Sequence, residues 1–425
     1  MNPHTLIKSE RDVSTYLQPV VLGADTLSYS YARCFHEAYG VNSIVIGTAD
    51  QKFVSSSRFV DYRMVPHADQ EATMLDYLDT LGRELEGKKV PILVGCGDWY
   101  ARIFSQNKQR LERYFVVPYI DFDLLDRITQ KGEFYRICEK LGIPYPKTWS
   151  FDCSDPNVRI PVDEFTYPVI AKPSNSARYH YAEFPGKEKV FTIETPEKLE
   201  YVFTELQKSV YDKDLIVQDC VPGDDAHLRS ITCFSDKDGN VLVSCIGQVL
   251  LQDHHPTAIG NPVCIIDDKQ PDVVAQAAKF LKETHYEGFS NFDAKYDERD
   301  GTYKFFEVNT RPGRNTYYLT LAGVNFVTLF VDHYVLGKTI KPRVADKDFL
   351  FQMVPKSVIK RYVAEPERSR ALARIKAGDA GCPLFYRKDT LAHLFWSAIN
   401  YFHQITKFRK YLGKPANSKT HYHVW

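Results

Sequence analysis

One stretch, residues 287–315, constrains the fold of this chain more than any other. Two apolar segments, 288–296 and 302–309, flank a cluster of turn-forming residues at 297–301. Alternating apolar runs on either side of such a cluster are typical of a β-hairpin. The chain must therefore build an antiparallel pair of strands here, and the rest of the domain must cover one face of that pair.

The hairpin brings polar side chains together. Asp293 is predicted to lie opposite Glu307, and Asn309 leaves the same strand face as Glu307 because it is two residues further on. Two carboxylates and an amide oxygen suit Mg²⁺ bound together with phosphates. Arg311 and Arg314 follow at once and can hold phosphate or carboxylate oxygens in a fixed fork. The alternative is that these acidic residues are only solvated, but a carboxylate inside an apolar run is costly unless it is paired.

Length and composition indicate a globular protein with more than one domain. The 425 residues are enough for two or three domains, and 44% of them are hydrophobic. No apolar run approaches the roughly 18–20 residues of a membrane helix, and the N-terminus does not read as a secretory signal. Nine dispersed cysteines without a CxxC pair predict reduced thiols. We therefore expect a cytoplasmic location.

The beginning of the chain reads as a parallel α/β domain, expected over residues 1–125. Apolar runs at 19–24 and 43–47 enclose a helical pattern at 28–39, which is a βαβ unit. A further strand is expected at 115–120. Only one glycine, Gly23, lies in the first turn, so the GxGxxG dinucleotide pattern is missing and NAD binding is not inferred.

The next segment, 126–338, carries a helix at 131–141 and then a new sheet. A short strand at 167–173 holds Lys172 near its end, beside a small polar loop, and this is a plausible phosphate clamp. Another strand, 215–223, ends in a Pro-Gly turn that is followed by two aspartates. A single apolar helix is expected at 316–336.

The C-terminal segment differs in charge from the rest. Residues 340–425 hold 17 Lys+Arg and 6 Asp+Glu, a net charge of +11, so the remainder carries −11. The segment 391–411 is amphipathic, and this combination suits an anionic surface such as the inner face of a membrane. Two alternatives stay open: an ordinary solvated basic face, and an apolar stripe that packs on the catalytic body. No nucleic-acid partner is expected.

The ordered set of Lys131, Lys172, the segment 218–223 and the hairpin resembles the ATP-grasp superfamily over residues 20–338. The resemblance implies an α+β fold with an N-terminal parallel α/β domain and a two-lobed core at 126–338, whose lid lies at about 165–222. A basic, mostly helical extension would follow at 339–425.

The resemblance also implies a role for each matching residue. Lys131 and Lys172 would hold the ATP phosphates, and the hinge from Gln218 through Asp219 to Val221 would bind adenine. Asp224 or Asp225 would bind the ribose, and Asp293, Glu307 and Asn309 would bind two Mg²⁺ ions. Arg311 and Arg314 would hold an acyl phosphate or the substrate carboxylate. The lid loop is often rich in glycine in this superfamily, whereas here it contains Ser174 and Ser176. These hydroxyls are candidates for contact with the γ-phosphate.

Within the superfamily, the run 307–314 and the basic, aromatic C-terminal region are similar to the bacterial D-aspartate ligases of peptidoglycan synthesis. This likeness implies ligation of an amino-acid carboxylate to an amine through an acyl phosphate, with a cell-wall precursor as the acceptor. Alternatives are a ligase that makes a small dipeptide or another amide, and a nucleotide-binding scaffold that acts through its C-terminal segment. Three histidines, His227, His254 and His255, either line the acceptor site or are structural.

Overall fold

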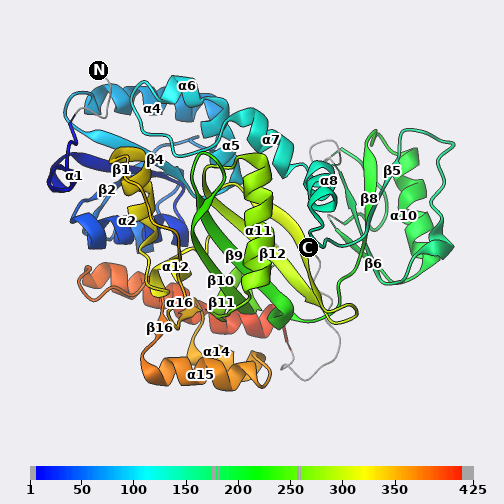
Figure 1. Cartoon of the computed structure of the whole chain (residues 1–425). Coiled ribbons are helices and arrows are strands. Elements are labelled where there is room, and N and C mark those ends of the chain that lie inside the picture. The colour runs from blue at the N-terminus through cyan, green and yellow to red at the C-terminus, as the bar shows by residue number, and fades with distance from the viewer. Residues whose placement is uncertain are drawn as a thin grey trace. The chain divides into compact units, whose positions relative to one another are not determined.

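The computed structural model describes residues 6–413 apart from 175–178, 180, 189, 256, 257 and 259. These residues form two compact units (Figure 1). The first unit contains the described parts of Met1–Phe134, Arg229–Asp293 and Glu307–Ser418, and the second contains those of Tyr135–Leu228 and Ala294–Phe306. The expected domain boundaries, 1–125, 126–338 and 339–425, stay predictions.

The first unit begins with a four-stranded parallel sheet in the order β3-β2-β1-β4. Its strands are β1 (Leu17–Leu22), β2 (Ser43–Gly47), β3 (Val60–Met64) and β4 (Val90–Gly95). Every residue of β2 and β4 is buried, which explains their continuous apolar runs. The helix α2 (Thr26–Tyr39) follows β1, and Asp25 caps it by accepting hydrogen bonds from the amides of Leu27 and Ser28.

A larger sheet has the strand order β13-β12-β9-β10-β11-β15-β16, with β14 paired to β10. It belongs to the first unit except for Leu228 and the hairpin residues Ala294–Phe306, which are counted in the second. The predicted hairpin, β12 (Gly288–Asp297) and β13 (Thr302–Asn309), lies at one edge of this sheet, with β13 outermost. The next strands are β9 (Leu228–Ser235), β10 (Val241–Gln252) and β11 (Pro262–Asp267). The helix α11 (Pro271–Thr284) packs on β10 (Figure 1).

The C-terminal segment is mostly helical, as predicted, but its short strands belong to the larger sheet. These strands are β14 (Arg343–Val344), β15 (Leu350–Gln352) and β16 (Ala380–Gly381), and the helices are α14 (Lys356–Tyr362), α15 (Glu367–Ala377) and α16 (Leu391–Tyr411). A buried apolar cluster joins β10, β11 and β15 to α14, α15 and Phe408 of α16. Deleting this segment would therefore remove part of the core of the first unit.

The second unit holds an antiparallel sheet in the order β5-β8-β6-β7. Its elements are β5 (Thr148–Asp152), β6 (Val169–Pro173), β7 (Phe191–Ile193), β8 (Asp214–Asp219) and the helix α10 (Pro196–Lys208). The apolar side of α10 packs on the sheet through Leu199, Val202, Phe203 and Leu206. Pro196 at the first helical position and Thr195 as cap explain why the helix begins here.

Two sequence expectations were wrong. The expected helix at 316–336 is divided into α12 (Tyr317–Leu321), α13 (Phe326–Phe330) and one π-helical turn (Val331–Val335). Gly323 adopts a positive φ of 101°, and Asn325 then caps a new helix. The expected strand at 115–120 is reduced to a single bridge between Ile92 and Val116. Among the described residues, no helix is long and apolar enough to cross a membrane.

Candidate active site

Three predicted metal ligands lie at the end of the hairpin that belongs to the first unit. The side-chain amide of Asn309 on β13 donates to Asp293 Oδ2 on β12 at 3.2 Å. Along β13, Phe306 and Val308 are buried, whereas Glu307 and Asn309 are partly exposed. The alternation therefore directs the two polar side chains to the same open face, as the strand period predicts.

The charged form of the Asp293 carboxylate is disfavoured by its surroundings, although Arg311 and the hydrogen bond from Asn309 offset part of this cost. Burial and the nearby charge of Glu307 raise the pKa of Asp293 to about 7. Asn291 steadies this carboxylate, because its amide donates to Asp293 Oδ1 at 3.4 Å while its own oxygen accepts from Ser230 and Thr232. A cation between the two carboxylates would remove their repulsion.

The donor set fits Mg²⁺. Among the residues that the structure describes, no group of three or more His, Cys, Asp or Glu side chains is arranged to hold a metal. The predicted site instead offers two carboxylates and one amide, all of which are hard oxygen ligands. Such ligands suit Mg²⁺, which keeps several waters and shares its coordination with phosphate oxygens, better than zinc or another soft metal.

Lys131 is the first residue of α8 (Lys131–Leu141), and its ammonium lies 3.4 Å from Glu307 Oε2. The lysine predicted to contact phosphate therefore adjoins a predicted metal ligand. The carboxylate of Glu307 is 42% exposed, so the apolar run around it does not bury its charge. A partly exposed pair of this kind contributes little to stability.

The two predicted arginines each pair with an aspartate from the N-terminal parallel sheet. Arg311 donates to Asp98 at 2.8 Å and to the amide oxygen of Asn309 at 3.4 Å. Arg314 lies 3.1 Å from Asp25. The Nε–H of Arg311 is buried and has no hydrogen-bond partner among the described residues. A buried donor without a partner is costly, so Arg311 is arranged to receive a further acceptor.

Both aspartates come from turns at the carboxyl ends of parallel strands, which is where open α/β sheets bind ligands. Asp25 follows β1, and Asp98 opens α5 (Asp98–Gln106) after β4. The two turns approach closely: Gly23 has a φ of 99°, and a Cβ there would lie 2.9 Å from Cys96 Cβ. The sequence analysis missed Asp25 and Asp98, and their only signal was their position directly after buried strands.

Lys172 and Gln218 meet inside the second unit. Lys172 is only 7% exposed, and its ammonium lies 3.5 Å from the side-chain oxygen of Gln218. The amide of Gln218 donates to Tyr135 and to Thr148, both at 2.8 Å. The buried side chain of Gln218 thus links Lys172 to Tyr135 and Thr148 and positions the lysine, so this side chain is not available to bind adenine.

The predicted adenine hinge begins in the last two residues of β8, Gln218 and Asp219, and continues to Val221. The amide of Asp219 donates to the carbonyl of Lys147 at 2.9 Å, and burial raises the pKa of the Asp219 carboxyl. The carbonyl of Val221 accepts from the ammonium of Lys295 at 2.9 Å. Lys295 is 1% exposed, and the sequence analysis missed it because a lysine in a strand usually points to solvent. Its hydrogen bond holds the hinge backbone in place.

The two predicted ribose ligands differ in exposure. Asp225 is buried, whereas the Asp224 side chain is 58% exposed. Asp224 caps the 3₁₀ turn Asp225–His227 and lies 2.9 Å from His227 Nδ1, while His227 Nε2 lies 3.1 Å from Glu298. His227 is therefore held between two carboxylates of the second unit, which matches the structural alternative for this histidine.

The other two histidines contact the C-terminal helix. The ring of His254 lies edge-on to Phe408, with ring centroids 5.8 Å apart, and that of His255 lies edge-on to Tyr411 at 4.9 Å. Of the two predicted lid-loop hydroxyls, Ser174 is exposed and its Oγ lies 3.4 Å from the Tyr211 hydroxyl. Ser176 lies outside the described residues.

The pairing of His227 makes a pH prediction. The hydrogen bond with Asp224 raises the pKa of His227 and lowers that of Asp224. A raised histidine pKa stabilises the fold fully below the unfolded value of about 6.5, and this contribution is lost as pH rises through the folded pKa. The lowered pKa of Asp224 contributes stability to the folded state above about pH 4, the unfolded pKa of an aspartate. We therefore expect the variant His227→Gln to be less stable than the parent at pH 6 and nearly equal to it at pH 9.

The difference should be about 0.5 kcal/mol, because the pair is partly exposed. Thermal unfolding of parent and variant at both pH values measures it. His403→Gln, at an exposed position, is the control. The difference in stability between this variant and the parent should be the same at both pH values. A difference in Tm for His227→Gln that is larger at pH 9 would contradict the assignment.

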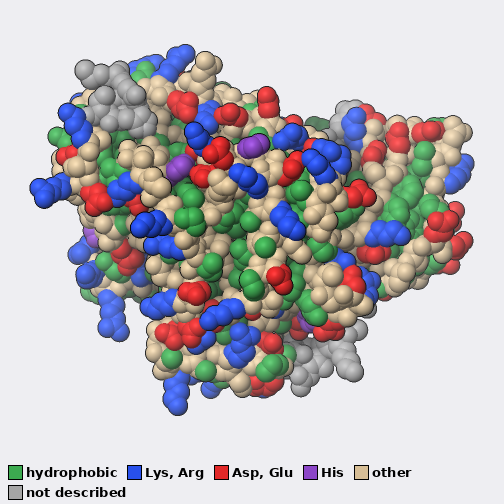
Figure 2. All heavy atoms as spheres, viewed as in Figure 1, with side chains coloured by type: hydrophobic (Ala, Val, Ile, Leu, Met, Phe, Trp, Pro, Cys, Tyr) green, Lys and Arg blue, Asp and Glu red, His purple; other side chains and the backbone are tan. Residues whose placement is uncertain are grey.

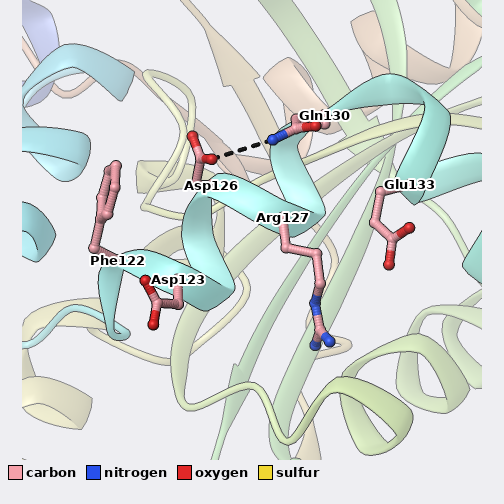
Figure 3. Close-up of a pocket in the computed structure, with 6 residues that line it drawn as sticks. All are labelled: Phe122, Asp123, Asp126, Arg127, Gln130 and Glu133. Atoms are coloured by element: carbon pink, nitrogen blue, oxygen red, sulfur yellow. Dashed lines mark hydrogen bonds between the residues drawn. The ribbon is translucent and has the colours of Figure 1, made fainter.

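A shallow pocket of about 350 Å³ lies in the first unit, on α7 (Phe122–Thr129) and the residues that follow it (Figure 3). Its lining residues are Phe122, Asp123, Asp126, Arg127, Gln130 and Glu133, and Gln130 donates to Asp126 at 3.1 Å. None of the predicted site residues lines this pocket, so it offers no support for the site described above.

The predicted residues therefore divide between the two units. The metal ligands, Lys131 and both arginines belong to the first unit, and Lys172, Ser174, the hinge residues and the two ribose candidates belong to the second.

Comparison with known proteins defines the class. The carbamoyl-phosphate synthase L chain, ATP binding domain family matches residues 130–320. An L-amino acid ligase from Bacillus licheniformis superposes with a TM-score of 0.52 at 15% identity, covering 76% of this chain and 74% of that one. A Hydrogenobacter thermophilus biotin carboxylase domain, solved with MgADP, ADP and bicarbonate, gives a TM-score of 0.54 at 17% identity, covering 79% and 73%. The protein is an ATP-grasp ligase that forms carbon–nitrogen bonds.

A relative of similar length makes the assignment more specific. The chain is 35% identical over 406 residues to the D-aspartate ligase of Enterococcus faecium, covering 92% of this chain and 96% of the relative. The chain belongs to the D-aspartate ligase family. The expected fold class and the resemblance to this family are thereby confirmed.

Proposed function

We propose that this enzyme, in the cytoplasm, uses ATP to join the β-carboxylate of D-aspartate to the lysine side-chain amine of a peptidoglycan precursor. The observation that carries the proposal is the 35% identity to a D-aspartate ligase across nearly the whole of both chains. The likeness to an L-amino acid ligase supports only the fold, because the two chains are 15% identical.

The reaction begins with phosphoryl transfer. The γ-phosphoryl group of ATP passes to a carboxylate oxygen of the amino acid, which gives an acyl phosphate and ADP. Such a transfer needs positioning and charge neutralisation rather than a covalent nucleophile. Lys131 and Lys172 supply positive charge to the phosphates. Asp293, Glu307 and Asn309 would hold Mg²⁺, which neutralises phosphate charge when it is bound.

The carboxylate substrate is assigned to Arg311 and Arg314. Arg311 has a buried Nε–H that lacks a partner among the described residues, and a carboxylate oxygen is the acceptor that satisfies it. Asp98 and Asp25 orient the two guanidinium groups through their ion pairs. A planar guanidinium fork can hold the carboxylate while one oxygen remains in reach of the phosphoryl group.

The nucleotide base is assigned to the backbone of Asp219 and Val221, with Lys295 holding the carbonyl of Val221. Asp224 and Asp225 are the ribose candidates, and Ser174 and Ser176 are the candidates for the γ-phosphate. In the second half-reaction the amine attacks the acyl carbon, the amide bond forms, and inorganic phosphate leaves. The amine loses one proton in this step.

A substrate panel tests the proposal. Each of D-aspartate, L-aspartate, D-asparagine and D-glutamate is paired with free lysine, a lysine-containing peptide and a lysine-containing cell-wall precursor. ADP release and product mass are scored for each pair. The proposal predicts that D-aspartate with the precursor gives the fastest turnover and an aspartyl amide. Turnover that is fastest with a free amino acid as acceptor would favour an enzyme that makes small dipeptides.

Replacing Lys172 should impair both ATP binding and chemistry. Lys172→Met removes a buried charge while keeping the length of the side chain. We expect the KM for ATP to rise and kcat to fall, each about 10-fold or more, because the charge acts on ground-state and transition-state phosphate alike. Lys208→Met removes an exposed lysine that pairs with Glu205 in the same unit and is the control. Unchanged constants in Lys172→Met would remove this lysine from the phosphate site.

A further inference from the structure

The helix α16 exposes large apolar side chains on one face. Leu391 is 85% exposed, Phe395 60%, Ile399 46% and Phe402 57%. Their spacing of three and four residues places them in a single row along the helix, and Trp396, which is 38% exposed, lies beside the row. These five side chains are named the apolar stripe. Isolated exposed apolar residues need no explanation, but a row of four with Trp396 beside it marks an interaction surface.

The opposite face of α16 is fixed to the first unit by polar groups. His393 is fully buried, with Nδ1 2.6 Å from the carbonyl of Phe53 and Nε2 2.8 Å from that of Leu384. Tyr401 donates to the carbonyl of Val354 at 2.9 Å. Turning the apolar stripe inward would break these hydrogen bonds and expose them to water. The stripe therefore points outward because the inward face is already occupied. Packing on the first unit holds for another part of the amphipathic segment, since Phe408 is buried in its apolar cluster and Ile405 packs against that cluster.

The charge around the apolar stripe has one sign. The helix contains no Asp or Glu among its 21 residues. Arg409 and Lys410 are exposed in its last turn, and Arg387 and Lys388 are exposed just before its first turn. The intervening Asp389 does not offset them at the surface, because its carboxylate is committed to Tyr29 and Ser57. An apolar row with cations at both ends complements a layered surface in which anionic groups cover an apolar interior.

We propose that α16 docks in the plane of an anionic phospholipid bilayer, with the apolar stripe in the acyl boundary and the terminal basic residues against lipid phosphates. This geometry is that of an interfacial amphipathic helix. A second copy of the chain fits less well. A two-fold pairing of antiparallel stripes would place the basic residues of one helix end against those of the other, which is repulsive.

Cosedimentation of the full chain with vesicles tests the proposal. One set is made of equal parts phosphatidylglycerol and phosphatidylcholine, and the other of phosphatidylcholine alone. We expect binding to the anionic vesicles, at least 10-fold weaker binding to the neutral ones, and a decrease at high salt. The double variant Phe395→Ser, Phe402→Ser should lose at least 10-fold in binding. Both positions are exposed, so the fold should be retained, and Tm checks this.

Met64→Ser is the matched control, because Met64 is 58% exposed in the same unit but lies on β3. It should bind like the parent. Parent chain that stays in the supernatant with anionic vesicles, or a double variant that binds like the parent, would overturn the proposal. So would a parent dimer that the double variant converts to monomer without vesicle binding, which would assign the apolar stripe to a second copy. Ligase activity on soluble substrates should be equal in all variants, so this test is independent of the proposed reaction.

Discussion

Replacing Glu307 with glutamine should abolish turnover while the protein stays folded. The variant keeps the shape of the side chain but removes one of the two charges that would hold Mg²⁺. We expect kcat for ADP release to fall by about 10²–10³-fold or more, since charge neutralisation at the phosphoryl group is the main catalytic contribution. Tm should be unchanged or slightly higher, because the repulsion with Asp293 is removed and Glu307 is 42% exposed.

Glu287→Gln is the matched control. Glu287 is 37% exposed and lies 2.7 Å from His333, so it is a partly exposed carboxylate with a basic partner in the same unit. Its replacement should leave turnover intact. The measurement is ADP release at a series of Mg²⁺ concentrations for the parent and both variants. Near-normal activity of Glu307→Gln at every Mg²⁺ concentration would remove Glu307 from the metal site.

Among the substitutions considered, replacing Arg311 with lysine should cause the second largest loss of catalytic activity. The charge remains, but the fork that bonds Asp98 and Asn309 is lost, and so is the unpartnered Nε–H. We expect kcat/KM for the amino-acid substrate to fall about 100-fold, as it does when a single positioned donor is removed from an active site. The KM for ATP should change little, because the arginine is assigned to the carboxylate.

Arg63→Lys provides the comparison. Arg63 likewise bonds two side chains, the carboxylates of Asp61 on its own strand β3 and of Glu84 on α4 (Glu71–Leu85). Steady-state kinetics with either substrate varied will separate the two effects. An Arg311→Lys enzyme whose KM for ATP rises while that for the amino acid is unchanged would reassign Arg311 to the phosphates.

The sequence predicted the hairpin and several helices well because local signals define them. The helices α10 and α11 each begin at a proline, and the turn between β12 and β13 ends at Gly301, which has a positive φ of 72°. Such signals act within a few residues and do not depend on the rest of the fold. The alternation that places Glu307 and Asn309 on one face is equally local.

Other features depend on contacts between distant residues. Asp98 is separated from Arg311 by 213 residues, and no local pattern marks it as a partner. In the sequence alone, Lys295 has the pattern of a surface residue. Only the fold places the carbonyl of Val221 beside its ammonium. The helical period of α16 is the same whether its apolar row is buried or exposed. The hydrogen bonds of His393 and Tyr401, together with the burial of Phe408, determine which face turns inward.

We propose that this chain activates the β-carboxylate of D-aspartate as an acyl phosphate. The most direct test uses D-aspartate labelled with ¹⁸O in its β-carboxylate, together with ATP, Mg²⁺ and the lysine-containing cell-wall precursor. Mass spectrometry of the products then follows the oxygen. We expect one ¹⁸O atom in each released phosphate and one in each aspartyl amide. Unlabelled phosphate released alongside the amide, with the second ¹⁸O found in AMP or in water, or no amide at all, would contradict activation as an acyl phosphate.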